Sequence, residues 1–196
     1  ATPPTPTLAN ASLWINYIYL DTAERRQFAQ IAHEYLIEQL QFTGAESFSQ
    51  TNVQQRLNFN HPVKMLVTAM QLTDNVQTVA QAGGDANRWT DFTDGSTPYA
   101  GSDPLVTMKL QLNGNDRFAA RPASYFNLTQ PLQHLPRGPA VGIYVYSFAI
   151  RPTEYQPSGT CNFSRIDNST LQTTMASSAP FNQYTYAISY NIGRVM

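Results

Sequence analysis

The residues best able to do chemistry in this chain are its three histidines, its single cysteine and a few aspartates. His33, His61 and His134 stand far apart and form no His-Glu-x-x-His pattern, so a zinc site would have to assemble entirely in space. His61 directly precedes Pro62, which favours a bend. We therefore interpret the histidines as turn or surface residues, and we expect neither a bound metal nor a cofactor.

Asp91 and the pair Asp94-Gly95 resemble part of a calcium-binding loop. They lack the alternating oxygen ligands and the terminal glutamate of that motif, so we interpret them as a polar turn. Cys161 has no activating partner beside it and is expected to pack as a small apolar residue. The sequence has no Gly-x-Ser-x-Gly motif, no phosphate-binding loop before a lysine and no dinucleotide fingerprint. We therefore predict no catalytic residue.

Four Asn-x-Ser/Thr triplets are present, at Asn10, Asn127, Asn162 and Asn168. They mark glycan sites only if the chain meets the enzymes of the secretory pathway. In a chain rich in Asn and Thr such triplets also arise by chance. Asn162 and Asn168 fall in a predicted strand, where a glycan fits only on an outer face. Asn127, Asn162 and Asn168 remain the candidate glycosylation sites.

Composition narrows the classes of partner. With 196 residues the chain can form one domain with its own core. Charged residues make up 13%, against roughly 25% in typical soluble domains, which favours packing against copies of itself. The net charge is −1 and the densest basic cluster is only Arg25-Arg26, so we expect no direct nucleic-acid binding. No apolar stretch reaches the ~20 residues of a membrane helix, and the first residues lack a signal-peptide pattern.

The N-terminal part predicts a strand followed by a helix. Residues 12–20 are aromatic and β-branched, which favours a strand. Asp21 followed by Glu24 forms a capping box, in which each side chain accepts from an otherwise unpaired backbone N–H. Apolar residues then recur at helical spacing, which predicts a connector helix over about residues 22–33.

After residue 34 the pattern has the period of two that is typical of strands. Residues 106–112 alternate apolar and polar side chains and run into Asn113-Gly114, a hairpin signal because both residues tolerate positive φ. Residues 184–195 place tyrosines and isoleucines on one face. Further strands are expected over residues 35–42, 53–59, 63–72, 142–150 and 161–174. Many short strands without alternating helices predict an all-β antiparallel sandwich or barrel.

Seven segments together resemble one protein family. They are Trp14–Arg26, His33–Gln41, Arg56–Lys64, Gln111–Phe118, Ser124–Asn127, Tyr144–Ala149 and Gln156–Asn168. In their order and spacing they resemble the major capsid protein of nucleocytoplasmic large DNA viruses, of the phycodnavirus and iridovirus type. The resemblance runs from about residue 12 to the end of the chain.

The resemblance implies an eight-stranded jelly roll, the second of the two that follow each other in members of this family. Residues 1–20 would then be a loop and the last strand of the first jelly roll. Residues 21–34 would be the connector helix, and residues 35–196 the second jelly roll. The polar stretch 74–104 would lie at the outward-facing top of the assembled particle.

The resemblance also implies a structural, non-enzymatic role in an icosahedral capsid. Three copies would form a trimer with a hexagonal outline, and the trimers would tile the shell. The partners would be other copies, neighbouring capsomers and minor capsid proteins, with no direct nucleic-acid contact and no membrane insertion. The location would be the virion, after assembly in the host cytoplasm.

Structural roles are expected for six motif residues. Asn113 and Gly114 would shape a tight turn. Pro157 and Gly159, with the serine between them, would form a turn that feeds the strand at 161–174. Arg165 and Asp167 would share a face of that strand and could pair with a neighbouring subunit; the alternative is an exposed ion pair worth under about 1 kcal/mol.

A second hypothesis is a binding module, because jelly rolls also serve as lectins and cupins. A sugar-binding domain would need an aromatic platform with polar neighbours. Trp89 and Phe92, both in the stretch 74–104, are the residues that could form it. An enzyme ranks third, because no catalytic motif is present.

Overall fold

The structure is a computed structural model that describes residues 10–76, 88–95, 97 and 99–195. The described chain divides into two compact units, Leu36–Ile192 and a smaller one made of residues 10–35 with 193–195. The hydrophobic core lies in the larger unit, whereas no described residue of the smaller unit is buried. None of the described helices combines the length and the apolar character that spanning a membrane requires.

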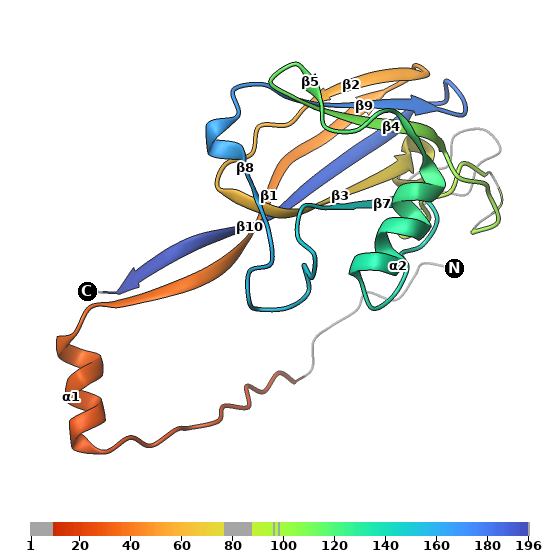
Figure 1. The fold of residues 1–196 in the computed structure, drawn as a ribbon. Coiled ribbons are helices and arrows are strands. Elements are labelled where there is room, and N and C mark those ends of the chain that lie inside the picture. Colours follow the sequence, from red (N-terminus) through yellow and green to blue (C-terminus); the bar gives the residue numbers. More distant parts are fainter. Residues whose placement is uncertain (1–9, 77–87, 96, 98, 196) are drawn as a thin grey trace. The chain divides into compact units, whose positions relative to one another are not determined.

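The larger unit is built on two facing β-sheets (Figure 1). Sheet A has the strand order β1 (His33–Phe48), β10 (Phe181–Val195), β3 (Pro62–Leu72), β7 (Ile143–Ser147), with β8 (Cys161–Asn162) also paired to β3. Sheet B has the order β2 (Asn52–Arg56), β9 (Ser169–Met175), β4 (Leu105–Leu112), β5 (Asn115–Asp116), with β6 (Arg121–Pro122) also paired to β4. The first four strands alternate between the sheets, as in a jelly roll.

The predicted all-β antiparallel sandwich is confirmed, but the strand count differs from eight. Five strands form each sheet within the described residues. Three of these strands, β5, β6 and β8, are only two residues long. They are short pieces that extend the sheet edges beside β4 and β3, so they add to the count without changing the architecture.

Helical segments occupy the connections. The predicted capping box is present at the start of α1 (Thr22–Gln30), where Asp21 Oδ1 accepts from Glu24 N at 2.8 Å. The helix ends three residues earlier than predicted because β1 already begins at His33. The other helical segments are η1 (Thr73–Val76), the π-helix η2 (Tyr125–Thr129), α2 (Gln130–His134) and η3 (Phe163–Arg165).

The strand predicted at residues 12–20 is not formed, because residues 10–20 pair with no strand in the described chain. Their aromatic and β-branched composition favours extended backbone, but a strand needs a partner for its N–H and C=O groups. Seven large hydrophobic side chains between Leu13 and Leu20 are exposed as a result.

The two sheets face each other across an apolar core. Leu66 and Tyr144 of sheet A and Leu110 and Leu171 of sheet B line the space between the layers. Because side chains alternate along a strand, these residues fix which positions point outward. Val67, Ala69 and Gln71 of β3 therefore lie on the outer face of sheet A.

Strand β10 turns its tyrosines away from this core. The hydroxyl of Thr185 and the amide of Gln183 donate to Gln55 Oε1 of sheet B, each at 2.6 Å. Both residues therefore point inward, and Tyr184 and Tyr186 lie on the outer face of sheet A. The aromatic face predicted for residues 184–195 exists, but the inner face of the strand carries small and polar side chains instead.

Candidate functional site

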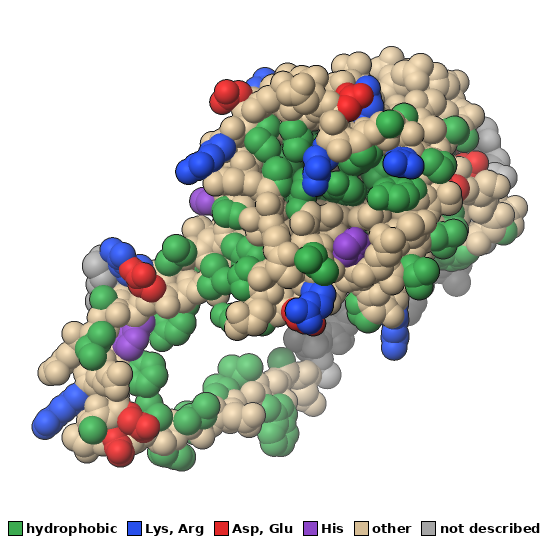
Figure 2. Space-filling view, viewed as in Figure 1, with side chains coloured by type: hydrophobic (Ala, Val, Ile, Leu, Met, Phe, Trp, Pro, Cys, Tyr) green, Lys and Arg blue, Asp and Glu red, His purple; other side chains and the backbone are tan. Residues whose placement is uncertain are grey.

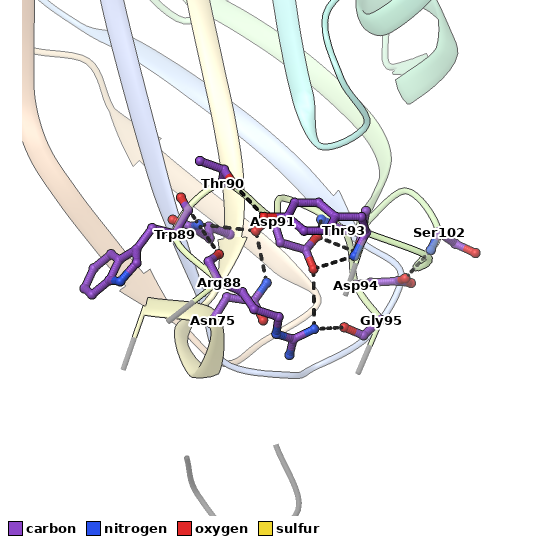
Figure 3. A network of polar contacts seen from close by, with 11 residues as sticks. Asn75, Arg88, Trp89, Thr90, Asp91, Thr93, Asp94, Gly95 and Ser102 are labelled. Atoms are coloured by element: carbon purple, nitrogen blue, oxygen red, sulfur yellow. Dashed lines mark hydrogen bonds and ion pairs between the residues drawn. The ribbon is translucent and has the colours of Figure 1, made fainter. Parts of the chain in front are cut away.

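The loop after η1 is held in place by a buried aspartate (Figure 3). Asp91 Oδ1 accepts from Thr93 N at 3.0 Å and from Thr93 Oγ1 at 2.8 Å. Its Oδ2 accepts from Tyr99 N at 3.0 Å and lies 3.4 Å from Arg88 Nη1. The main-chain oxygen of Asp91 accepts from Asn75 Nδ2 at 3.0 Å. The side chain of Asp91 thus ties the loop to itself, and its main-chain oxygen ties the loop to η1.

These contacts determine the charge of Asp91. Burial raises the pKa of its carboxyl, but the hydrogen bonds from Tyr99 and Thr93 and the positive charge of Arg88 outweigh burial, so the pKa lies below its ordinary value. The carboxylate oxygens therefore accept from protein donors and do not face an empty cation site. The structure agrees with the interpretation of a polar turn, and the described residues contain no group of three His, Cys, Asp or Glu side chains that could hold a metal.

An aromatic groove lies between this loop and the outer face of sheet A. Its volume is about 400 Å³, and its lining residues are Val67, Ala69, Gln71, Val76, Trp89, Phe92, Ile143, Tyr184 and Tyr186. Gln71 connects the two sides, because its Nε2 donates to the main-chain oxygens of Trp89 at 2.9 Å and Asp91 at 3.2 Å. In Figure 3 the ring of Trp89 points away from the polar network around Asp91.

The two aromatic residues proposed for a sugar platform, Trp89 and Phe92, do meet in this groove. Sugars need several polar groups to bond their hydroxyls. Among the described residues no charged side chain lines the groove, and both N–H groups of its one described amide, Gln71, have acceptors in the loop. The geometry therefore favours apolar side chains over a sugar as the occupant.

Asn113 and Gly114 occupy the turn between β4 and β5, where Leu112 pairs with Asn115. Their φ angles are 50° and 79°, the positive values that a two-residue turn of this kind requires. Asn113 has a further role that the sequence pattern did not indicate. Its Oδ1 accepts from Asp167 N at 3.0 Å and Asn168 N at 3.2 Å, which ties the turn to the segment before β9.

The turn expected at Pro157 and Gly159 lies further upstream, at residues 152–153, and residues 157–160 form an irregular return to β8. Gly159 has φ of 141°, and a Cβ there would lie 2.9 Å from Phe148 O. This close approach of two backbone segments requires glycine.

The strand predicted over residues 161–174 is interrupted, so Arg165 and Asp167 do not share a strand face. Asn162 Oδ1 accepts from Ser164 N at 3.1 Å and opens η3, which contains Arg165. Asp167 lies in the loop between η3 and β9, with its N–H bonded to Asn113. Side chain-to-backbone bonds of this kind compete with strand pairing and end the strand after two residues.

Asn127 is buried and does not present its side chain for glycosylation. Its Nδ2, the atom to which a glycan attaches, donates to Ala140 O at 3.0 Å and to Ile143 O at 2.9 Å. Nearby, Gln130 Oε1 accepts from Ser147 N at 3.1 Å. The side-chain amides of Asn127 and Gln130 thus form hydrogen bonds with backbone groups on and next to β7. Asn10, Asn162 and Asn168 are exposed.

We expect Asn127→Ala to destabilise the fold by about 1–3 kcal/mol, because two buried carbonyls lose their donor. Asn168→Ala is the matched control. Asn168 is exposed, and its Oδ1 accepts a 3.4 Å bond from the Thr170 hydroxyl, so its removal should cost under about 0.5 kcal/mol. Urea unfolding of both variants measures the difference. Equal midpoints for the two variants would show that the amide of Asn127 does not stabilise β7.

All three histidines are half-buried, and the prediction of a turn position holds for His61, which has φ of 65° at the bend before β3. His33 instead begins β1, and His134 ends α2 with its Nδ1 2.8 Å from Ile150 O. Cys161 is half-buried against the core, and this burial raises the pKa of its thiol. A thiol with a raised pKa is a poor nucleophile at neutral pH.

Comparisons with known proteins were made by family, sequence and structure. The family model described as "Large eukaryotic DNA virus major capsid protein" matches residues 24–196. The major capsid protein of Pyramimonas orientalis virus is 44% identical over 97% of this chain and 48% of its own length. That of Paramecium bursaria Chlorella virus 1 is 47% identical over 83% of this chain and 41% of its own length. The chain thus spans about half the length of these curated relatives.

Solved structures agree with the sequence comparisons. The PBCV-1 VP54 crystal structure fitted into a reconstruction of the virophage Sputnik superposes with a TM-score of 0.72 at 38% identity, over 92% of this chain and 53% of that one. The Faustovirus major capsid protein superposes with a TM-score of 0.70 over 90% of this chain and 36% of its own, at 15% identity. At that identity the second likeness concerns the fold alone.

Proposed function

Because the chain belongs to the family of large eukaryotic DNA virus major capsid proteins, we propose that it serves as one jelly roll of a capsid subunit whose trimers tile an icosahedral shell. The sandwich in the larger unit supports this role, because it is a rigid layered body with its own core. The role is structural and includes no catalytic step. Its setting is the virion shell, formed in the host cytoplasm.

The observation that carries the proposal is the uncovered apolar arm, residues 10–20. Trp14, Ile18 and Tyr19 are each more than 85% exposed, and Figure 2 shows hydrophobic side chains gathered along this segment. An apolar extended segment without a partner is a hazard for a protein that acts alone. Its composition suits a strand of a sheet that this chain does not itself provide.

We assign the parts of the chain accordingly. Residues 1–20 contribute a loop and the last strand to a preceding jelly roll, residues 21–34 connect, and residues 35–196 form the second jelly roll; of these, residues 1–9, 77–87, 96, 98 and 196 lie outside the described residues. The smaller unit supports this division by its internal contacts. α1 begins with a capping box, and the Phe28 and His33 rings lie 5.1 Å apart. An ion pair joins Glu34 to Arg194.

The partners proposed for the subunit are other copies in the same trimer, neighbouring capsomers and minor capsid proteins. The composition supports protein partners rather than nucleic acid. The two adjacent arginines, Arg25 and Arg26, are the densest basic cluster, too few to neutralise the several phosphates that a genome-binding surface contacts.

We expect the arm to cause association of the isolated chain. Removing residues 1–20 should remove the large, heterogeneous species from the sample, because the arm buries its apolar side chains against other molecules. Size-exclusion chromatography with light scattering measures the change. The triple substitution Trp14→Ser, Tyr17→Ser and Ile18→Ser is a matched control that keeps the chain length. If the intact, truncated and substituted chains are equally monodisperse, the arm is not an unpaired strand.

A further inference from the structure

The two sheets differ in the chemistry of their outer faces. The outer positions of sheet B are polar, and hydrogen bonds cross from strand to strand. Gln172 Nε2 donates to Gln111 Oε1, and Gln111 Nε2 donates to Asp116 Oδ1, each at 2.7 Å. Lys109 is paired with the same carboxylate at 3.3 Å. Polar side chains that hydrogen-bond one another in this way suit a face that is in contact with water.

The outer face of sheet A is apolar around the aromatic groove. The Phe42 ring of β1 stacks on Tyr186 at 4.6 Å and lies 6.4 Å from Tyr184. Val67, Ala69 and Ile143 extend the same surface into the groove. An antiparallel sheet that meets water normally carries polar residues on that side, so the pattern of sheet A is that of a sheet covered on both faces.

The loop around Asp91 covers only part of this face. Phe42 is 46% exposed and Trp89 is 54% exposed, although Trp89 lines the apolar groove of about 400 Å³ and Phe42 stacks on Tyr186, which lines the same groove. Leu40, two residues before Phe42 on the edge strand β1, is 66% exposed. Aromatic side chains around a concave apolar centre are typical of the centre of a protein–protein interface.

We infer that this outer face of sheet A, which includes Phe42, Trp89 and the aromatic groove, is the surface on which a second copy of the chain docks. The inference rests on the proposed function and names the surface through which it works. In a shell built of many identical subunits, a second copy of the chain is the protein available to pack against this surface. The described lining residues of the groove are uncharged, and only 13% of the chain is charged, so another copy can pack against these residues without burying an unpaired charge in the interface.

Trp89 reports directly on this surface. The sequence has two tryptophans, so Trp14→Ser leaves Trp89 as the single tryptophan, whose emission can be excited apart from that of the tyrosines. Tyr17→Ser with Ile18→Ser further weakens association through the arm. In this background we expect acrylamide quenching of Trp89 to fall as protein concentration rises. Phe42→Glu should shift the midpoint of that change to at least about tenfold higher concentration. Leu40→Glu, at a more exposed position, should do the same without a risk to folding.

The control is Gln54→Glu, which adds the same charge at an exposed outer position of sheet B and should leave the midpoint unchanged. Quenching of Trp89 that does not depend on concentration would overturn the inference, as would equal shifts from Gln54→Glu and Phe42→Glu. Shielding of Trp89 in a monomer that carries an upstream domain would assign the groove to that domain and also overturn it. If complete subunits form trimers while Trp89 stays exposed, the inference fails and the proposed function stands.

Discussion

Asp91→Asn is expected to destabilise the protein by about 3–5 kcal/mol, because it removes one partner of a buried ion pair. The side chains of Arg88 and Asp91 are 7% and 0% exposed. The substitution also weakens the acceptor for the N–H groups of Thr93 and Tyr99. The loop that borders the aromatic groove should loosen, and urea unfolding with hydrogen exchange across residues 88–103 measures both effects.

The chain contains a matched control for this substitution. Arg151 and Glu154 form an ion pair at the same i,i+3 spacing, at 3.2 Å, but both side chains are exposed. Glu154→Gln should therefore cost under about 1 kcal/mol. Equal losses of stability in Asp91→Asn and Glu154→Gln would show that burial does not determine how much the Arg88–Asp91 ion pair stabilises the protein.

The same pair predicts a pH dependence. The pKa of Asp91 is lowered in the folded protein from its ordinary value of 3.8. Its contribution to stability is therefore fully present above that value, and it is lost as the pH falls through the lower pKa of the folded state. The stability difference between the original protein and Asp91→Asn should shrink over this acidic range and stay constant above it.

Gly142→Ala is the second substitution with a large expected effect, a loss of about 3 kcal/mol. Gly142 has φ of 83°, which costs an L-residue roughly 1–2 kcal/mol. A Cβ at this position would also collide with the main-chain oxygen of Phe92, and overpacking of this kind costs about 1–3 kcal/mol. The substitution should push the loop off the sheet, open the groove and lower the unfolding midpoint.

Gly138→Ala is its control, because no atom lies within 4 Å of a Cβ at Gly138 and its φ is not in the left-handed region. This substitution should be neutral or stabilise the protein by about 0.4–1 kcal/mol through the unfolded state. Thermal unfolding of the two variants compares them. The steric account is wrong if Gly142→Ala unfolds at the same temperature as Gly138→Ala.

Local signals predicted much of the architecture. The period of two located the long strands, and the capping box at Asp21 located the start of α1. For residues 106–112 the period of two does not predict correctly which side chains are buried. A register shift between Leu105 and Thr107 places Leu105 in the core and leaves Val106 exposed. A bulge is set by the pairing of two distant strands, which the sequence of one strand does not contain.

The functional surface was less accessible to prediction. The period of two places the aromatic residues of β10 on one face but does not say which face is buried, and Gln55, Gln183 and Thr185 occupy the space between the sheets. Buried amides of this kind give no periodic signal, because each depends on a partner more than a hundred residues away. Trp89 and Phe92 were singled out correctly as a pair, but the apolar character of their groove follows from sheet A and not from the loop.

The mass of the complete gene product under native conditions tests most directly whether this chain is one jelly roll of a trimeric capsid subunit. Sequencing upstream of residue 1 supplies that product, and native mass spectrometry counts its copies. The account predicts a second strand-rich domain upstream, paired with the arm at residues 10–20, and an assembly of three copies. A complete product that is well folded and contains a single copy at every concentration would contradict it.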